Sequence, residues 1–241
     1  MTDPIANQRP HLSAGVRIYA VGDIHGCADL LEGVFGRIDA DRASSASSRT
    51  VEVYLGDLID RGGASRHVID LLIERKLNHE VVCLKGNHED LALRFLSSPQ
   101  LFEGWAGLGG RETLRSYGLT PLARKPDEMA ALAGAFGEAL PAAHRNFLLS
   151  LPAFFSCGDF FFVHAGVKPG VPLERQREQD LLWIRQEFLS WDAPFEKMII
   201  HGHTPVQVPD FRDNRVNVDT GAYATGRLSC LRIEGTELAL V

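Results

Sequence analysis

Five short polar clusters in this sequence combine carboxylate, amide and imidazole side chains. They are Asp23–His25, Asp57–Arg61, Asn87–Glu89, His164–Gly166 and His201–His203. Together they offer a mixed set of oxygen and nitrogen ligands. Such a set suits Mn, Fe or Zn better than calcium, which prefers oxygen ligands alone. The residue types therefore predict a transition-metal site.

Each polar cluster directly follows a short apolar run that is typical of a β-strand. The five runs are Arg17–Val21, Val51–Leu55, Val81–Leu84, Phe160–Val163 and Met198–Ile200. Ligands of open α/β sheets gather at the carboxyl ends of the strands, so we expect the clusters to meet there. One such cluster is more often structural than catalytic. Five of them in one chain are hard to explain by turn chemistry alone.

Helical patterns fill several gaps between these runs, at Leu30–Ile38, Ser65–Lys76 and Pro141–Leu149. This alternation favours an α/β fold. The end of the chain differs, because three successive strands are expected there without long helices between them: Arg215–Val218, Leu228–Ile233 and Leu238–Val241. We therefore expect two mixed sheets packed face to face, with helices outside. A mostly helical cap is expected beside the site, over about residues 91–149.

Length and composition predict one large domain. The chain has 241 residues and is 45% hydrophobic, which is enough for a well-buried core. We expect a flexible arm over residues 1–14, a single domain over residues 15–241 and an exposed loop at Ala43–Arg49. The formal net charge of −6 argues against a general nucleic-acid binder.

The four cysteines and the lack of long apolar segments bear on localisation. The cysteines are far apart in sequence, which argues against a disulfide scaffold and favours a reducing cytoplasm: Cys27, Cys83, Cys157 and Cys230. The first 13 residues contain no apolar signal core. No stretch approaches the roughly 18 apolar residues of a membrane span. We expect a cytoplasmic protein that is not in a membrane, and the sequence leaves the oligomeric state open.

The ordered motifs GDIHG, GDLIDRG, GNHE, HAG and HGHT resemble a known signature. They are similar to those of the phosphoprotein phosphatase family of calcineurin-like metallophosphoesterases, in particular its bacterial serine/threonine protein phosphatases. The resemblance extends from about Val16 to Ala222. It implies a β-sandwich flanked by helices, with a di-metal centre at one edge. Two divalent ions are implied; Mn is favoured, and Fe and Zn combinations also fit the ligands.

The resemblance implies a role for each matching residue. The metal ligands would be Asp23, His25, Asp57, Asn87, His164 and His203. The first two would bind one metal, the last three would bind the other, and Asp57 would bridge both. His203 precedes the threonine of HGHT and is therefore expected as a ligand, whereas coordination by His201 stays open.

The remaining motif residues would act on the substrate. His88 resembles the general acid of the family, and Asp60 would orient it. Arg61 and Arg185 resemble two phosphate-binding arginines, and Asn87 would also contact the phosphate. Two metals would hold a shared water or hydroxide for in-line attack on phosphorus. A proton donor for the leaving oxygen is worth roughly 10²–10⁴-fold in rate.

Two substrate classes agree with this resemblance. GNHE rather than GNHD, together with Leu181–Leu189, favours phosphoserine and phosphothreonine in proteins. Symmetrical dinucleoside tetraphosphates are the alternative, because a related subfamily shares almost the same motifs. Lys85 stands where many members have an arginine, which puts one bidentate contact in doubt. Trp105 and Tyr117 are candidate platforms for a nucleotide, although core packing is the expected role of each.

The third hypothesis is a metal-binding scaffold without turnover, which would be a non-catalytic protein and not an enzyme. Degenerate enzymes usually lose a metal ligand or the general acid. All of these residues are present in this chain, so the sequence favours an active hydrolase.

Overall fold

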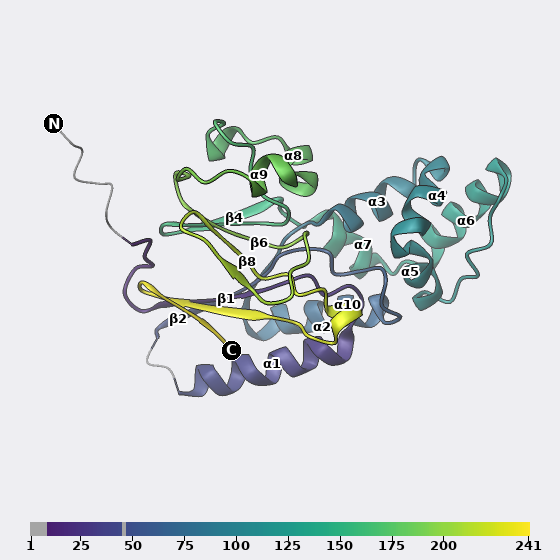
Figure 1. Cartoon of the computed structure of the whole chain (residues 1–241). Coiled ribbons are helices and arrows are strands. Elements are labelled where there is room, and N and C mark those ends of the chain that lie inside the picture. Colours follow the sequence, from purple (N-terminus) through teal and green to yellow (C-terminus); the bar gives the residue numbers. More distant parts are fainter. Residues whose placement is uncertain (1–8, 45–46) are drawn as a thin grey trace.

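Two five-stranded mixed sheets form the centre of the molecule in the computed structural model, which describes residues 9–44 and 47–241 (Figure 1). The first sheet has the strand order β10-β9-β1-β2-β3 and the second β4-β5-β6-β8-β7. The strands of the first are β1 Val16–Val21, β2 Arg49–Tyr54, β3 Glu80–Cys83, β9 Cys230–Glu234 and β10 Glu237–Leu240. Those of the second are β4 Phe154–Cys157, β5 Phe160–Val163, β6 Met198–His201, β7 Asp210–Phe211 and β8 Arg215–Asn217.

Strand direction explains where the polar clusters lie. In the first sheet β1, β2 and β3 are parallel, and in the second β5, β6 and β8 are parallel. Strands β9 and β10 of the first sheet and β4 and β7 of the second pair antiparallel with their neighbours. The five polar clusters follow β1, β2, β3, β5 and β6 at their carboxyl ends. The expected pair of mixed sheets is confirmed.

Alternation along β1 divides the apolar residues between two cores. Ile18 and Ala20 belong to the layer between the two sheets, together with residues from β2, β5 and β9. Tyr19 and Val21 face the other way and pack with the helices. Successive side chains of a strand point to opposite faces, so a strand that is apolar throughout must be covered on both sides.

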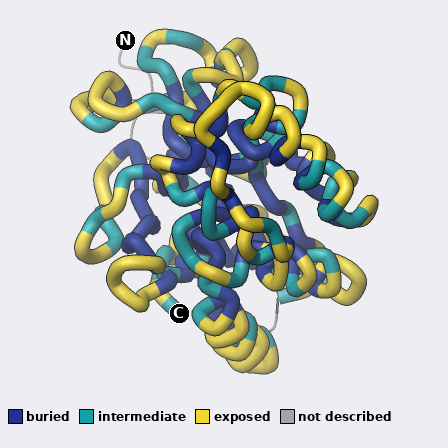
Figure 2. The backbone as a smooth tube through the Cα atoms, turned by 90° about the vertical axis from the view of Figure 1, so that its right-hand side faces the viewer, coloured by how far each residue is buried: buried dark blue, intermediate teal, exposed yellow. Residues whose placement is uncertain are grey.

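Helices cover the outer face of each sheet. Helices α1 (Ala28–Ala43) and α2 (Ser65–Asn78) pack on the first sheet through residues such as Leu31 and Val68. On the second sheet, α8 (Glu178–Trp183) and α9 (Gln186–Leu189) contribute Leu181 and Phe188 to a smaller core. Figure 2 shows the result, with buried residues inside and exposed residues on the outer turns of the helices.

Residues 87–149, here called the cap, form helices and connecting turns on one side of the sheets (Figure 1). Their bounds are α3 Asn87–Phe95, η1 Pro99–Leu101, α4 Phe102–Trp105, η2 Ala106–Gly110, α5 Arg111–Ser116, α6 Pro126–Ala139 and α7 Ala142–Leu149. The cap has an aromatic interior, in which the ring centre of Phe95 lies 5.2 Å from that of Trp105. Two short helices lie elsewhere, η3 at Leu173–Arg175 and α10 at Ala222–Thr225.

The described end of the expected N-terminal arm is packed. Leu12 is only 2% exposed and belongs to the core between the sheets. Its amide donates to Gly235 O at 2.9 Å, and the amide of Asp159 donates to His11 O. The expected flexibility of the arm therefore does not apply around His11 and Leu12, because a buried apolar side chain and main-chain hydrogen bonds anchor this segment. Residues 1–8, and 45–46 of the expected loop, lie outside the described residues.

No helix in the described part of the chain is both long and apolar enough to cross a bilayer.

Candidate metal centre

Three of the polar clusters meet around His164. Its Nε2 lies 2.9 Å from Asn87 Oδ1, 3.0 Å from His203 Nδ1 and 3.3 Å from Asp57 Oδ1. These residues follow β5, β3, β6 and β2, so both sheets contribute. All four side chains are buried. Donor atoms that are far apart in sequence thus converge on one point.

The protonation of His164 makes this convergence informative. Its Nδ1–H donates to Leu55 O at 2.9 Å, so in a neutral ring Nε2 carries a lone pair. Burial lowers the pKa of His164, although the Asp57 carboxylate opposes it, which favours the neutral ring. The lone pair then faces two acceptor oxygens without a proton between them. A cation at this point would relieve that repulsion.

A second group lies on the other side of Asp57. His25 Nε2 is 3.5 Å and His88 Nε2 is 3.6 Å from Asp57 Oδ2. His25 donates from Nδ1 to Ile59 O at 3.0 Å, and burial lowers its pKa to about 3, so Nε2 again carries a lone pair. The two oxygens of Asp57 therefore face two different groups of possible metal ligands, here called the donor groups. One consists of Asp57, His164 and His203, and the other of Asp57, His25 and His88.

Asp23 adds negative charge to the same place. Its Oδ2 accepts from the amide of His203 at 3.0 Å, whereas its Oδ1 is buried with no hydrogen-bond partner among the described residues. Burial, and then the charges of Asp219 and Asp57, raise the pKa of Asp23 well above its usual value. Buried carboxylates that repel one another are stabilised by a cation. The donors present therefore fit divalent metal ions.

Backbone strain is concentrated in the same clusters. Among the described residues, the non-glycine residues with positive φ are His25, Asp57, Asp60, Arg61 and His203, with values from 47° to 73°. This left-handed conformation costs about 1–3 kcal/mol per residue in strained sites and usually persists only where surrounding contacts enforce it. Each of the five belongs to one of the polar clusters. The strained backbone therefore lowers the stability of the fold, and it sets the direction of these side chains.

Glu89 holds the strained turn after β2, a function that the motif alone did not reveal. Its carboxylate accepts from the amides of Asp57 at 3.0 Å, Leu58 at 2.8 Å and Ile59 at 3.2 Å. It also accepts from the amide of Gly86 at 2.8 Å. Glu89 is fully buried, so these four bonds replace its contacts with water. In the sequence, the only indication of this role is that the GNHE motif ends in an acidic residue to which no other role is assigned.

Asp60 and His88 form a buried hydrogen-bonded pair. His88 Nδ1–H donates to Asp60 Oδ2 at 2.7 Å. Two further cap residues bind the same carboxylate: Trp105 Nε1–H donates to Oδ2 at 2.7 Å, and the Thr113 hydroxyl donates to Oδ1. Burial alone would lower the pKa of His88, but the Asp57 and Asp60 carboxylates outweigh it and raise that pKa. The cap thus fixes the orientation of this pair.

Arg61 lies between the cap and the loop that follows β8. Its amide donates to Gly109 O at 3.2 Å. Gly109 has φ 110°, and a Cβ there would lie 2.5 Å from Arg61 N, so this contact requires glycine. The Arg61 Cζ lies 4.6 Å from the ring centre of Tyr223. Tyr223 was not predicted, because no motif marks it.

The other predicted polar residues are placed differently. Arg185 is exposed, donates to Thr204 Oγ1 at 3.2 Å, and its charge helps to lower the pKa of His203 after burial and His164. It therefore lies at the rim beside His203. Lys85 instead pairs with Glu178 at 2.7 Å. His201 packs its ring on Phe188, with centres 4.9 Å apart, and is in neither donor group.

The aromatic residues suggested as nucleotide platforms are buried. Trp105 is 0% exposed and its N–H is used by Asp60. Tyr117 is 6% exposed and bonds through its hydroxyl to His144 at 2.9 Å. A platform role for either residue is wrong, because neither presents a face to a ligand. Packing in the cap, the expected alternative, is what the structure shows.

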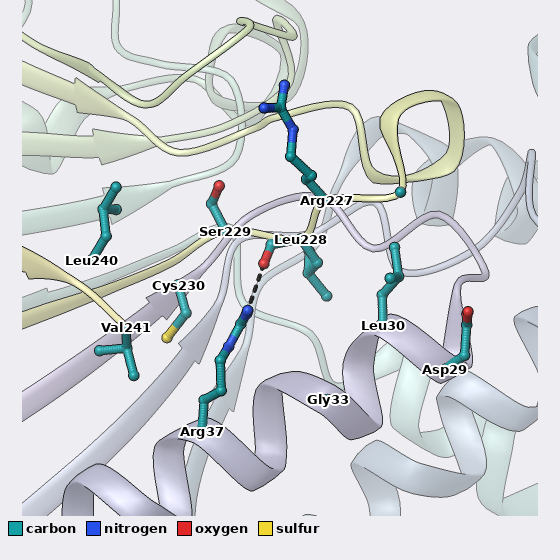
Figure 3. A pocket seen from close by; sticks show the side chains of 11 residues that line it. Asp29, Leu30, Gly33, Arg37, Arg227, Leu228, Ser229, Cys230, Leu240 and Val241 are labelled. Atoms are coloured by element: carbon teal, nitrogen blue, oxygen red, sulfur yellow. Dashed lines mark hydrogen bonds between the residues drawn. The ribbon is translucent and has the colours of Figure 1, made fainter.

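A surface cavity of about 550 Å³ lies elsewhere, between α1 and the strands β9 and β10 (Figure 3). Arg37 extends from α1 and donates to Leu228 O at 2.9 Å, and Cys230 and Val241 line the opposite side. None of the predicted site residues lines this cavity. The donor groups are therefore the better candidate for chemistry.

The chain is similar to known proteins along most of its length. The family profile described as calcineurin-like phosphoesterase matches residues 16–232. A curated relative from Anoxybacillus flavithermus, named bis(5'-nucleosyl)-tetraphosphatase PrpE [asymmetrical], is 26% identical and is aligned over 92% of each chain.

Two solved structures have a similar fold. One, described as a candidate diadenosine tetraphosphatase, has a TM-score of 0.62 at 22% identity and is matched over 95% of this chain and 98% of that one. A protein serine/threonine phosphatase from Saccharomyces cerevisiae has a TM-score of 0.59 at 15% identity, over 95% of this chain and 80% of that one. At these identities the likeness establishes the fold alone.

Proposed function

Because the chain belongs to the calcineurin-like phosphoesterase family, we propose that it is a metal-dependent hydrolase of dinucleoside tetraphosphates. The observation that carries this substrate is the named activity of the Anoxybacillus flavithermus relative, which aligns along nearly the whole chain. We propose asymmetrical cleavage, which gives a nucleoside monophosphate and a nucleoside triphosphate. The predicted symmetrical cleavage is then the less favoured variant.

Six residues would hold two divalent ions in this proposal. Asp23 and His25 would bind one ion, and Asn87, His164 and His203 would bind the other. Asp57 has one carboxylate oxygen near His25 and the other near His164, and it would bridge the two ions. When bound, the ions would offset the charge of the phosphate and acidify a water molecule. Manganese is our first choice, with Fe and Zn combinations as alternatives.

His88 would supply the proton for the leaving oxygen. Its Nδ1–H is committed to Asp60, so Nε2 is the atom that would hold the transferable proton. The raised pKa of His88 favours the protonated ring near neutral pH. Asp60 would orient the imidazole and stabilise its charge, while Trp105 and Thr113 fix Asp60. Hydrogen-bonded carboxylates commonly serve this purpose for catalytic histidines.

Two arginines would bind the phosphate groups. The planar guanidinium can donate two parallel hydrogen bonds to one phosphate. Arg61 lies beside the His25 group and Arg185 beside the His203 group, so cations border both donor groups. A polyphosphate chain offers several charged groups to such a pair. Asn87 would contact the reacting phosphate as well.

Phosphoproteins remain the second candidate, since the GNHE motif and Leu181–Leu189 resemble bacterial protein phosphatases. The test is a side-by-side assay with manganese, comparing kcat/KM for diadenosine tetraphosphate with kcat/KM for a phosphoserine or phosphothreonine peptide. Asp57→Asn serves as the metal-site control. A strong preference for the dinucleotide, with AMP and ATP as products, supports the proposal. Two ADP molecules would indicate symmetrical cleavage, and a strong preference for the peptide would overturn the proposed substrate.

A further inference from the structure

Tyr223 is an exposed aromatic residue that touches the candidate site. Its side chain is on α10, and the residue is 45% exposed. The ring centre lies 4.6 Å from Arg61 Cζ and 5.4 Å from the ring centre of His25, at an interplanar angle of 85°. Trp183, which contacts His203, is partly buried by comparison. Tyr223 therefore offers an aromatic surface next to both a donor histidine and a phosphate-binding arginine.

The loop that carries Tyr223 is held in place from both ends. Gly221 and Gly226 bound α10 with φ of 64° and 68°, a conformation that glycine adopts readily. The Thr225 hydroxyl donates to Thr220 O at 2.8 Å, and the amide of Gly221 donates to Asp219 Oδ1 at 2.8 Å. The ring is thus positioned before any ligand binds. Such preorganisation lowers the entropic cost of binding.

We propose that Tyr223 is a specificity-determining residue that stacks on the base of the nucleotide whose phosphate reacts. The inference rests on the proposed function and names the part of the substrate that this surface recognises. Bases stack on aromatic side chains with little dependence on sequence, because every base has a flat π face. Arg61 would bind the phosphate of the same nucleotide, so two touching side chains would recognise its two ends.

The position of Tyr223 also bears on which bond is cleaved. In asymmetrical hydrolysis the water oxygen bonds to the phosphorus that carries a nucleoside, and the bond from this phosphorus to the bridging oxygen breaks. The proton of the attacking water is lost to solvent, and the proton from His88 passes to the bridging oxygen of the leaving nucleoside triphosphate. In symmetrical hydrolysis a further phosphate separates the reacting phosphorus from its nucleoside. Tyr223 and Arg61 are in direct contact, which suits the shorter distance between base and reacting phosphorus in asymmetrical hydrolysis.

The experiment compares Tyr223→Ala, Tyr223→Phe and Tyr223→Trp with the wild-type enzyme. Two substrates are used, diadenosine tetraphosphate and glycerol phosphate, which has no base. Inhibition constants for AMP and for inorganic phosphate give a binding readout that does not depend on turnover. Trp191→Ala is the control for loss of an exposed ring: Trp191 is 39% exposed, and its carbonyl accepts from Asn214, at the amino end of β8.

Tyr223→Ala should lower kcat/KM for the dinucleotide and weaken AMP inhibition by about tenfold to a hundredfold, the range expected for one stacked base. Activity on glycerol phosphate and inhibition by phosphate should change less than about threefold. The Phe and Trp variants should retain the wild-type behaviour, since they keep a ring. Equal losses on both substrates would overturn the proposal and indicate that Tyr223 only orients Arg61. A wild-type enzyme that hydrolyses glycerol phosphate but no dinucleotide would instead overturn the proposed function.

Discussion

The Asp60–His88 pair shows how much of the proposed chemistry depends on single contacts. Asp60 accepts hydrogen bonds from His88, Trp105 and Thr113, so its orientation is set by the cap as well as by the turn that follows β2. Removing its charge leaves the imidazole without a stabilising partner. The consequence should appear in the pH dependence of turnover.

Asp60→Asn should shift the alkaline limb of kcat to lower pH by about one unit. The sign follows from the charge: without the carboxylate, the imidazolium of His88 is less stable, its pKa falls, and the proton is lost at lower pH. The measurement is a kcat profile between pH 5 and about 10, read against the ordinary histidine pKa. Asp70→Asn is the matched control, because Asp70 pairs with His144 at 2.7 Å within the α2–α7 contact. An unchanged alkaline limb in Asp60→Asn would contradict the assignment of His88 as the acid.

Glu89→Gln should weaken both folding and metal binding. The amide can accept with only one oxygen and presents an NH₂ group to amides that also donate, so some of the four bonds are lost. We expect a loss of about 2–3 kcal/mol in the free energy of unfolding, the cost of a buried charge-assisted network. Urea denaturation and titration calorimetry with Mn²⁺ would measure the two effects. Glu178→Gln, half-exposed and paired with Lys85, should be close to wild type in both.

Between elements, the contact of α1 and α2 with β2 contains a buried ion-pair network. Glu52 on β2 is fully buried and binds Arg42 of α1 and Arg75 of α2. Arg75 also pairs with Asp39, and the Tyr54 hydroxyl donates to Glu52 at 2.7 Å. The network joins two helices to the first sheet. Because β2 leads directly into Asp57, its stability supports the site.

Glu52→Gln should destabilise the fold by about 3 kcal/mol, because it leaves two arginines without their buried partner. Glu80→Gln on the neighbouring strand is the control. Its ion pair with Arg49 is 45–48% exposed, and such pairs contribute at most about 1 kcal/mol. Parallel denaturation curves at neutral pH would measure both. Equal effects of the two substitutions would show that burial does not govern the strength of these pairs.

For the whole molecule, the donor groups join the two sheets and the cap. His164 and His203 follow strands of the second sheet, Asp23 and Asp57 follow strands of the first, and Asn87 begins the cap. Mutual repulsion of buried carboxylates opposes this assembly in the absence of cations. Metal binding should therefore stabilise the complete fold and not only one loop.

Manganese at about 100 times its Kd should stabilise the protein by about 2.7 kcal/mol for each occupied site. For a chain of this length each bound ion then corresponds to a rise in Tm of roughly 5–10 °C. Chelation should reverse the rise, which scanning fluorimetry would detect without any assay of activity. Asp57→Asn should lose most of the shift, whereas Asp213→Asn, at an exposed position between β7 and β8, should retain it. A full shift in Asp57→Asn would contradict its assignment as a bridging ligand.

The sequence by itself determined the family, the two mixed sheets and the set of polar clusters. These depend on local information: short apolar runs followed by turn-forming residues predict strands, and residue type fixes which atoms can bind a metal. The roles of Asp23, His25 and the other motif residues stay predictions, although the structure brings most of them together. The phosphoserine and phosphothreonine substrate also stays a prediction.

Tertiary structure decided which side chains are covered and which are free. Trp105 and Tyr117 have the chemistry of a platform but are buried in the cap, whereas Tyr223, without a motif, is exposed beside Arg61. Leu12 was likewise expected in a flexible arm and lies in the core. Exposure depends on contacts between segments that are more than 100 residues apart in the chain, such as the one between Arg61 and Tyr223. Local residue patterns carry no information about such contacts, so only the folded chain could show them.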